Sequence, residues 1–256
     1  MLQIITLPAR QDNYIWLLKK GQHAAVVDPG DAAPVIERLQ QLGVKLDAIL
    51  VTHYHADHIA GIPDLLRLYP QALCYGPQAT HPGLPTKIPL TDGQHLRLER
   101  MGISFEVMQL PGHTPEHIAY LGEGCLFCGD VLFAGGCGRL LDGTAEQMQN
   151  SLQRIKQLPE QTRIYCAHEY TQSNLAFCQL VEPDNQQTTE RLRLVSKLRQ
   201  QGLPTLPSTL AEELRTNVFL RTQIPQVRHW AERNALRECE NEIHVFAILR
   251  EKKNNL

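Results

Sequence analysis

The segment "ILVTHYHADHIAG" at residues 49–61 constrains the fold of this chain more than any other. An apolar run at residues 49–51 leads into His53, His55, Asp57 and His58. A buried histidine explains one such residue and a solvated patch explains two or three, but neither explains four polar residues directly after an apolar strand. In an extended loop His53 and His55 point to the same side, whereas Asp57 and His58 diverge at a helix start. The pattern predicts a strand that ends in a metal-binding loop, and the divergence favours two metals over one.

Three more ligand-type side chains follow apolar runs. "FEVMQLPGH" ends in His113, "CLFCGD" ends in Asp130 and "IYCAH" ends in His168. Open α/β sheets place their sites outside the carboxyl ends of strands, and a polar residue beside an apolar run is costly unless it is paired. We therefore expect all three to join the site, with Asp130 as the bridge because a carboxylate has two oxygens.

The expected donor set is imidazole and carboxylate, with no cysteine. Such donors suit Zn(II), Fe(II) or Mn(II), and we favour Zn(II). Two ions roughly 3.5–4 Å apart can share a water, lower its pKa and polarise a carbonyl. The sequence therefore predicts a hydrolytic centre with two divalent metal ions.

Three features near these residues have competing explanations. His117 is either a ligand or an orienting residue, and we favour the orienting role. The turn at residues 28–30 is expected as a turn, with hydrogen-bonded support of the site as the alternative. Cys125 and Cys128 form a C-x-x-C pair, but the apolar residues between them indicate a buried strand rather than an exposed redox site. The odd total of 7 cysteines suits reduced thiols.

Length and charge restrict the class of protein. A chain of 256 residues that is 43% hydrophobic can bury a core without disulfides. A formal net charge of -2 argues against a general nucleic-acid binder. The first residues lack a basic stretch before an apolar run, and no window is apolar enough to span a membrane. We expect a cytoplasmic monomer with no nucleic-acid or membrane partner.

The pattern of apolar and polar residues changes near residue 170. Before it, short apolar runs alternate with helix candidates at Ala33–Leu42, 59–69 and 144–158. After it, helix-favouring segments dominate, including 184–201 and a capping box formed by Thr209 and Glu212. We predict a sheet domain over residues 1–170 that carries the catalytic site, and a helical, substrate-binding domain over residues 171–256.

At this point the sequence resembles the metallo-β-lactamase superfamily, through "THYHADH", His113, Asp130, His168 and "VVDPGD". A closer resemblance, over almost the full length, is to the glyoxalase II family of hydroxyacylglutathione hydrolases. It rests on "DNYIWLL", "GDVLFAGGCGRLLDGT", "AHEYTQSNL", "NVFLR" and the terminal "REKK". The resemblance implies an α/β fold, the metallo-β-lactamase αββα sandwich, followed by a C-terminal helical domain.

The resemblance also implies a ligand assignment and a substrate site. One metal takes His53, His55 and His113, the other takes Asp57, His58 and His168, and Asp130 bridges the two. The residues implied on the glutathione side are Arg139, His168, Tyr170, Arg250 and Lys252. The chain departs from the family pattern at Leu141, Leu249 and Val218.

The implied reaction is hydrolysis of S-(2-hydroxyacyl)glutathione, chiefly S-D-lactoylglutathione, to glutathione and D-lactate. This is the second step of methylglyoxal detoxification. A hydroxide held between the metals attacks the thioester, and Asp57 or Asp130 accepts the proton of the water. One rival is a glutathione persulfide dioxygenase with a single iron, which His168 and the helical domain disfavour. A non-catalytic metal-binding module is the other rival, and it would be expected to have lost a ligand.

Overall fold

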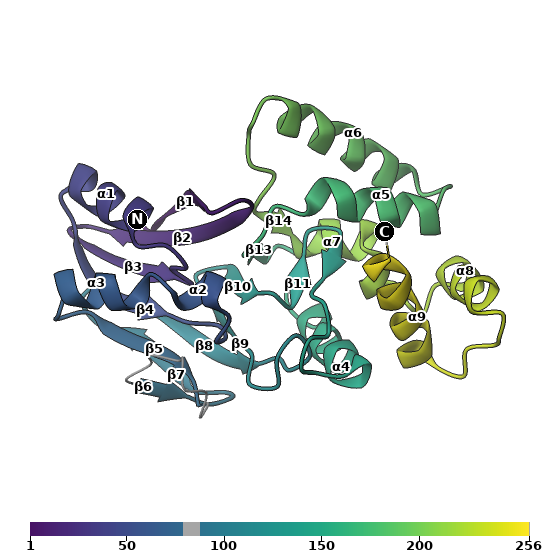
Figure 1. The fold of residues 1–256 in the computed structure, drawn as a ribbon, viewed down its shortest axis with the longest axis horizontal. Helices are drawn as coiled ribbons and strands as arrows, with labels where there is room; N and C mark the ends of the chain where they lie inside the picture. The colour runs from purple at the N-terminus through teal and green to yellow at the C-terminus, as the bar shows by residue number, and fades with distance from the viewer. Residues whose placement is uncertain (79–87, 256) are drawn as a thin grey trace. The chain divides into compact units, whose positions relative to one another are not determined.

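Two sheets form the framework of one compact unit, which comprises residues 1–109 and 116–129. The computed structural model describes residues 1–78 and 88–255. The first sheet follows the order β1 (Gln3–Ala9), β2 (Asn13–Lys20), β3 (His23–Val27), β4 (Lys45–Leu50), β5 (Leu73–Pro77) and β6 (Ile88–Leu90) (Figure 1). The second contains, in order, β10 (Cys125–Gly129), β9 (Ile118–Gly122), β8 (Ile103–Gln109) and β7 (His95–Leu98).

The strand directions differ between these sheets. In the first, β1, β2 and β3 pair antiparallel, whereas β3 to β6 pair parallel. All the pairs from β7 to β10 are antiparallel. The parallel strands β3 and β4 are the ones expected to be buried on both faces. Towards their carboxyl ends both strands meet that expectation, because residues 24–27 of β3 and 48–50 of β4 are buried without interruption.

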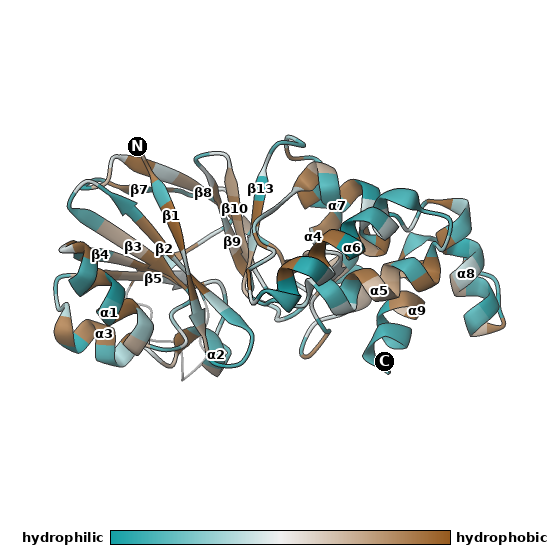
Figure 2. Cartoon of the chain, turned by 90° about the horizontal axis from the view of Figure 1, so that it is seen from above, coloured by the Kyte–Doolittle hydropathy of each residue, from teal (hydrophilic) through white to brown (hydrophobic). Residues whose placement is uncertain are grey.

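Helices cover one face of the first sheet. Val26 of β3 and Ile49 of β4 share a core cluster with Leu39 of α1 (Ala33–Leu42) and Leu65 of α3 (Ile62–Leu68). Figure 2 shows these two helices together on one side of the sheet. Because alternate residues of a strand point to opposite faces, Leu50 lies on the other face, and it is also fully buried.

The helix predicted at Ala33–Leu42 is confirmed, with a left-handed Gly43 at its end. The helix predicted at 59–69 is confirmed over α3 (Ile62–Leu68), but it begins later than predicted, and a separate one-turn helix, α2 (Ala56–Ile59), precedes it. Gly61 separates them at a point of close approach, where a Cβ would lie 2.6 Å from the Pro29 carbonyl oxygen. The chain thus turns tightly against residues 28–31 instead of continuing one helix.

A buried tyrosine joins the two sheets of this unit. The hydroxyl of Tyr120, on β9, donates a hydrogen bond of 2.8 Å to the carbonyl of Val51, at the end of β4. Tyr120 is fully buried, and its ring contacts Phe105 of β8 edge to face. Burial raises the pKa of Tyr120 well above its ordinary value, so the hydroxyl stays protonated and donates. The contact fixes the strand end that leads into the residues 53–58.

The second unit comprises residues 110–115 and 130–256. Its elements, in chain order, are β11 (Leu132–Phe133), β12 (Gly136–Cys137), α4 (Ala145–Lys156), β13 (Arg163–Cys166), α5 (Thr171–Val181), α6 (Gln186–Gln200), β14 (Ser208–Thr209), α7 (Leu210–Thr216), a 3-10 turn (Val218–Leu220), α8 (Pro225–Ala235) and α9 (Glu242–Asn254). Within the unit, α5 packs on α6, and α9 packs on both α4 and α8. Of the helices in the described part of the chain, none has the length and apolar character to cross a membrane.

Several predicted helices of this unit are confirmed. Thr209 and Glu212 form the expected capping box of α7. The segment predicted at 184–201 forms α6, and Gly202 follows it with a φ of 69°. The predicted boundary after residue 170 coincides with the start of the largely helical part of the chain. The division into compact units falls at other residues, so the domain boundary at residue 170 stays a prediction.

The first prediction concerns the link between the sheets. We expect Tyr120→Phe to lower the free energy of unfolding by about 1–3 kcal/mol, because it leaves a buried carbonyl without this donor. Tyr69→Phe, at a half-buried residue after α3, is the control and should change it by no more than about 0.5 kcal/mol. Urea unfolding at a fixed metal concentration measures both. Equal stabilities for the two variants would show that the Tyr120 hydrogen bond contributes nothing.

Candidate metal centre

Four ligand-type side chains follow β4 in the first unit. His53 and His58 are fully buried, and Asp57 and His58 lie in the one-turn helix α2. Nε2 of His53 and Nδ1 of His55 are 3.0 Å apart, and Oδ2 of Asp57 and Nε2 of His58 are 3.4 Å apart. The rings of His53 and His58 have centroids 4.1 Å apart. The predicted histidine and aspartate cluster is therefore brought together within this unit.

A buried carboxylate supports this cluster. Oδ1 of Asp28 accepts a hydrogen bond of 2.8 Å from the Thr52 main-chain N–H, and Oδ2 accepts one of 2.7 Å from the Thr52 hydroxyl. Oδ2 also lies 3.0 Å from Nδ1 of His58. With its proton on Nδ1, His58 presents the lone pair of Nε2 as a ligand. Asp28 is thus placed to orient the ring of His58.

The turn at residues 28–31 packs against the segment 52–58, which carries His53, His55, Asp57 and His58 and is called the ligand loop below. A Cβ on Gly30 would lie 1.7 Å from the carbonyl oxygen of Asp57, so only glycine fits there. The segment is indeed a turn, since the Gly30 N–H donates to the Asp28 carbonyl at 2.8 Å. The alternative considered from the sequence, support by hydrogen bonds, is also correct. The two roles coincide because the turn directs the Asp28 side chain at Thr52 and His58.

His117 stacks on the ligand cluster of the same unit. Its ring is fully buried, with its centroid 4.8 Å from that of His53 and an angle of 21° between the planes. Such stacking fixes the plane of the His53 ring. This contact agrees with an orienting role for His117.

The second unit holds the remaining three ligand-type residues. His113 follows β8, Asp130 follows β10 and His168 follows β13, and each is less than a tenth exposed. Oδ2 of Asp130 lies 3.5 Å from Nε2 of His113 and 3.4 Å from Nε2 of His168. Nδ1 of His113 lies 2.8 Å from the carbonyl of Arg139, to which it donates when Nε2 is the ligand atom. The carboxylate of Asp130 is therefore close to two imidazoles, as a bridging ligand requires.

The donor chemistry of both sets fits a divalent metal. Neutral imidazole and carboxylate suit Zn(II), Fe(II) and Mn(II), and the orienting carboxylate and carbonyl fix the tautomers that such binding needs. The thiols are poor competitors: burial raises the pKa of Cys137 to about 11 and that of Cys166 to about 12. These cysteines stay protonated at neutral pH, in keeping with reduced, structural thiols.

The residues expected on the substrate side all belong to the second unit. Tyr170 is 36% exposed and stacks on His168, with centroids 4.8 Å apart and an interplanar angle of 5°. Arg139 is exposed in the loop after β12. Lys252 is half-buried on α9.

Arg250 is held differently from the other expected substrate residues. It is only 6% exposed, its Nη1 donates to the Cys137 carbonyl at 2.7 Å, and its guanidinium lies over the Phe219 ring. Lys253, which was not among the expected residues, donates from Nζ to the Ser173 carbonyl at 3.2 Å. Burial, and then the charges of Arg250 and Arg139, lower the pKa of Lys253. Arg139, Arg250 and Lys253 therefore form one positive region.

Comparison with known proteins identifies the family. Residues 10–168 match a family model described as the metallo-beta-lactamase superfamily, and residues 169–256 match one described as the hydroxyacylglutathione hydrolase C-terminus. The chain is 56% identical over 256 residues to a hydroxyacylglutathione hydrolase of Tolumonas auensis, with 100% of both chains covered. It is 52% identical over 252 residues to one of Aeromonas salmonicida, with 98% of each covered.

Solved structures agree on the fold. ETHE1 from Myxococcus xanthus matches with a TM-score of 0.67 and 22% identity, over 100% of this chain and 92% of that one. TTHA1623 in a di-iron-bound form matches with a TM-score of 0.61 and 26% identity, over 85% of this chain and 100% of that one. The predicted metallo-β-lactamase fold with a C-terminal helical region is confirmed. The chain belongs to the metallo-β-lactamase superfamily and, within it, to the hydroxyacylglutathione hydrolase family.

Proposed function

We propose that this protein hydrolyses S-(2-hydroxyacyl)glutathione, chiefly S-D-lactoylglutathione, to glutathione and D-lactate at a centre of two divalent metal ions. The observation that carries the proposal is the full-length similarity to named hydroxyacylglutathione hydrolases, together with the match of residues 169–256 to the C-terminal part of that family. Zn(II) is the favoured metal, with Fe and Mn as alternatives.

The proposed ligand assignment follows the family. One metal would be held by His53, His55 and His113. The second would be held by Asp57, His58 and His168, and Asp130 would be shared by the two. Short distances support it: His53 lies close to His55, Asp57 lies close to His58, and Asp130 lies close to both His113 and His168. The di-iron-bound form reported for TTHA1623 also supports it.

The protein groups have distinct roles in the proposed reaction. When bound, two divalent ions lower the pKa of a shared water and polarise the thioester carbonyl. Asp57 or Asp130 accepts the proton of the attacking water. Asp28 keeps Nε2 of His58 available as a ligand atom. Collapse of the tetrahedral intermediate releases glutathione thiolate, whose negative charge the positive region of the second unit favours.

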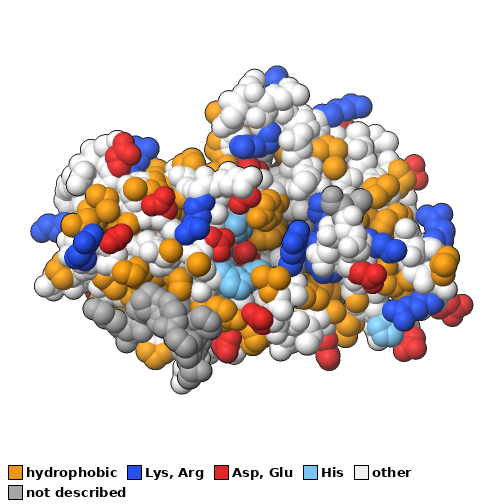
Figure 3. All heavy atoms as spheres, in the orientation of Figure 1, with side chains coloured by type: hydrophobic (Ala, Val, Ile, Leu, Met, Phe, Trp, Pro, Cys, Tyr) orange, Lys and Arg blue, Asp and Glu red, His pale blue; other side chains and the backbone are white. Residues whose placement is uncertain are grey.

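The glutathione part of the substrate carries two carboxylates. We propose that Arg139, Tyr170, Arg250 and Lys252 contact it, with His168 beside the reacting group. Arg250 already donates from Nη1 to the Cys137 carbonyl, and this hydrogen bond also helps to place α9. On the face shown in Figure 3, Lys and Arg side chains are interspersed with Asp and Glu side chains. We also propose that the protein acts as a cytoplasmic monomer.

The experiment that tests this function measures loss of the ultraviolet thioester absorbance of S-D-lactoylglutathione, together with metal content. We expect close to two metal ions per chain and loss of activity on treatment with a chelator, restored by added metal. A protein that is fully active with one equivalent of iron, and that consumes oxygen with glutathione persulfide, would instead be the persulfide dioxygenase.

The second prediction tests the support given by Asp28. We expect Asp28→Ala to weaken metal binding by about 10- to 100-fold, because His58 loses the partner that fixes its tautomer. Competition with a chromophoric chelator measures this affinity. Asp31→Ala is the control, since Asp31 lies in the same turn but accepts from the Ala33 N–H. An unchanged affinity in Asp28→Ala would contradict the orienting role.

The third prediction concerns Lys252. The carboxylates of glutathione carry the same charge in the ground state and in the transition state, so a cation that pairs with one supplies uniform binding. We expect Lys252→Ala to raise KM about 3- to 10-fold, to leave kcat nearly unchanged, and to make KM less sensitive to salt. Lys197→Ala, which removes a lysine from the last turn of α6, is the matched control. A KM equal to that of the control would place Lys252 outside the substrate site.

A further inference from the structure

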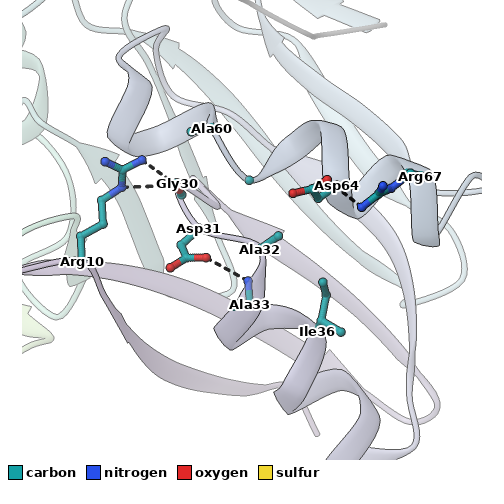
Figure 4. Close-up of a pocket in the computed structure, with 10 residues that line it drawn as sticks. Arg10, Gly30, Asp31, Ala32, Ala33, Ile36, Ala60, Asp64 and Arg67 are labelled. Carbon is teal, nitrogen blue, oxygen red and sulfur yellow. Dashed lines mark hydrogen bonds and ion pairs between the residues drawn. The ribbon is translucent and has the colours of Figure 1, made fainter.

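The tight connection between β1 and β2 reaches two loops of the first unit that are distant in sequence. Arg10 adopts a φ of 51°, which turns the chain sharply. Its guanidinium donates to the Gly30 carbonyl at 3.0 Å and 3.3 Å, and to the Ala56 carbonyl at 3.3 Å. Figure 4 shows the side chain extended towards Gly30. Arg10 therefore joins the turn at residues 28–31 to the start of α2.

Asn13, at the start of β2, contacts Asp57 directly. Its Nδ2 donates to Oδ2 of Asp57 at 3.0 Å and lies 3.4 Å from the Asp57 carbonyl oxygen. Both groups on Asp57 are acceptors, so the amide nitrogen rather than the amide oxygen must face them. Asn13 is 6% exposed, which makes this contact a buried one on the side of Asn13.

The helix that carries Asp57 constrains the carboxylate of this residue only weakly. Its helix, α2, is a single turn of four residues, and the side chain of Asp57 is 33% exposed. A short helix with an exposed carboxylate leaves the rotamer of that carboxylate poorly determined, and a metal site needs its ligands held to within about 0.5 Å. Contacts from elsewhere in the fold must therefore supply the constraint.

Three contacts in this unit converge on Asp57. Gly30 packs against its carbonyl, where no Cβ would fit. Arg10 holds the carbonyl of the preceding residue, Ala56, and Asn13 holds both the side chain and the main chain of Asp57. Among these three, Asn13 alone touches the carboxylate, which also lies 3.4 Å from Nε2 of His58, so Asn13 is the one of the three that acts on the rotamer of Asp57.

We infer that Asn13 is a positioning residue for the metal ligand Asp57, acting from the β1–β2 connection that Arg10 anchors. The inference rests on the proposed function in one respect, namely that Asp57 is a ligand. Asn13 does not contact the substrate or the metal in this scheme. It acts by fixing which way the Asp57 carboxylate points, and loss of its amide lowers the affinity of the one metal that Asp57 binds.

The test uses the full-length, metal-free protein and titrates Zn(II) against a chromophoric chelator, with Co(II) absorption spectra as a second readout. We expect Asn13→Ala and Asn13→Leu to weaken one of two metal equivalents about tenfold or more and to leave the other within about twofold. The visible spectrum of that equivalent of Co(II) should also change, because the geometry of its ligands changes. Leucine matches asparagine in shape, so Asn13→Leu separates loss of the amide from loss of volume and decides the test if Asn13→Ala does not fold.

Two further variants make the result specific. Asp47→Ala removes two side-chain hydrogen bonds, to His23 and Arg100, from β4 of the same sheet, and should leave both equivalents unchanged. Asp57→Ala should abolish the weakened equivalent. If Asp57→Ala loses one metal equivalent and Asn13→Leu loses none, Asn13 has only a structural role. The inference about Asn13 then fails, whereas the proposed ligand assignment stands. If Asp57→Ala loses none, Asp57 is not a ligand, and the proposed assignment fails with it.

Discussion

The buried carboxylate of Asp28 is the group on which the ligand loop of the first unit depends. It accepts hydrogen bonds from the main chain and hydroxyl of Thr52 and lies 3.0 Å from Nδ1 of His58. Burying a carboxylate to 4% exposure costs free energy unless hydrogen-bond donors face it, and the Thr52 and His58 groups supply those donors here. Its cost is thus offset by the same contacts that set the loop geometry.

This arrangement explains why a turn with unusual backbone geometry occurs there. Asp28 has a φ of 49°, which is uncommon for a residue with a side chain. In this conformation the Asp28 side chain reaches Thr52 and Gly30 passes against the Asp57 carbonyl, and the hydrogen bonds of Asp28 compensate the strain. The first sheet supplies the rigid support: β3 and β4 are parallel neighbours, and both are buried. Support for the site therefore begins in the core rather than in the loop.

Much of the site could be predicted because its signals are local. His53, His55, Asp57 and His58 follow one apolar run within six residues, and the capping box of α7 is readable from two residues three positions apart. The partners of these residues could not be predicted in the same way. Asp28 and His58 are 30 residues apart, and Asn13 and Asp57 are 44 apart, so no periodicity connects them.

Local patterns also failed where tertiary contacts override them. The helix predicted at 59–69 is interrupted because Gly61 must pass close to Pro29, which the helical pattern does not reveal. The near-complete burial of Arg250 and its hydrogen bond to the Cys137 carbonyl are likewise not readable from the family motif that contains it. In both cases a contact more than thirty residues away in sequence determines the local structure.

Within the second unit, the loop after β12 both orients a metal ligand and contributes a positive charge. The main-chain carbonyl of Arg139 accepts from His113 and so fixes the ligand ring, while the Arg139 side chain is exposed and contributes to the positive region. A close approach makes this possible, since a Cβ at Gly138 would lie 1.9 Å from the Asp130 carbonyl oxygen. Because the orienting group belongs to the main chain, the side chain at position 139 can vary without disturbing His113. A main-chain group thus orients the ligand His113, whereas the side chain at the same position is available to contact the substrate.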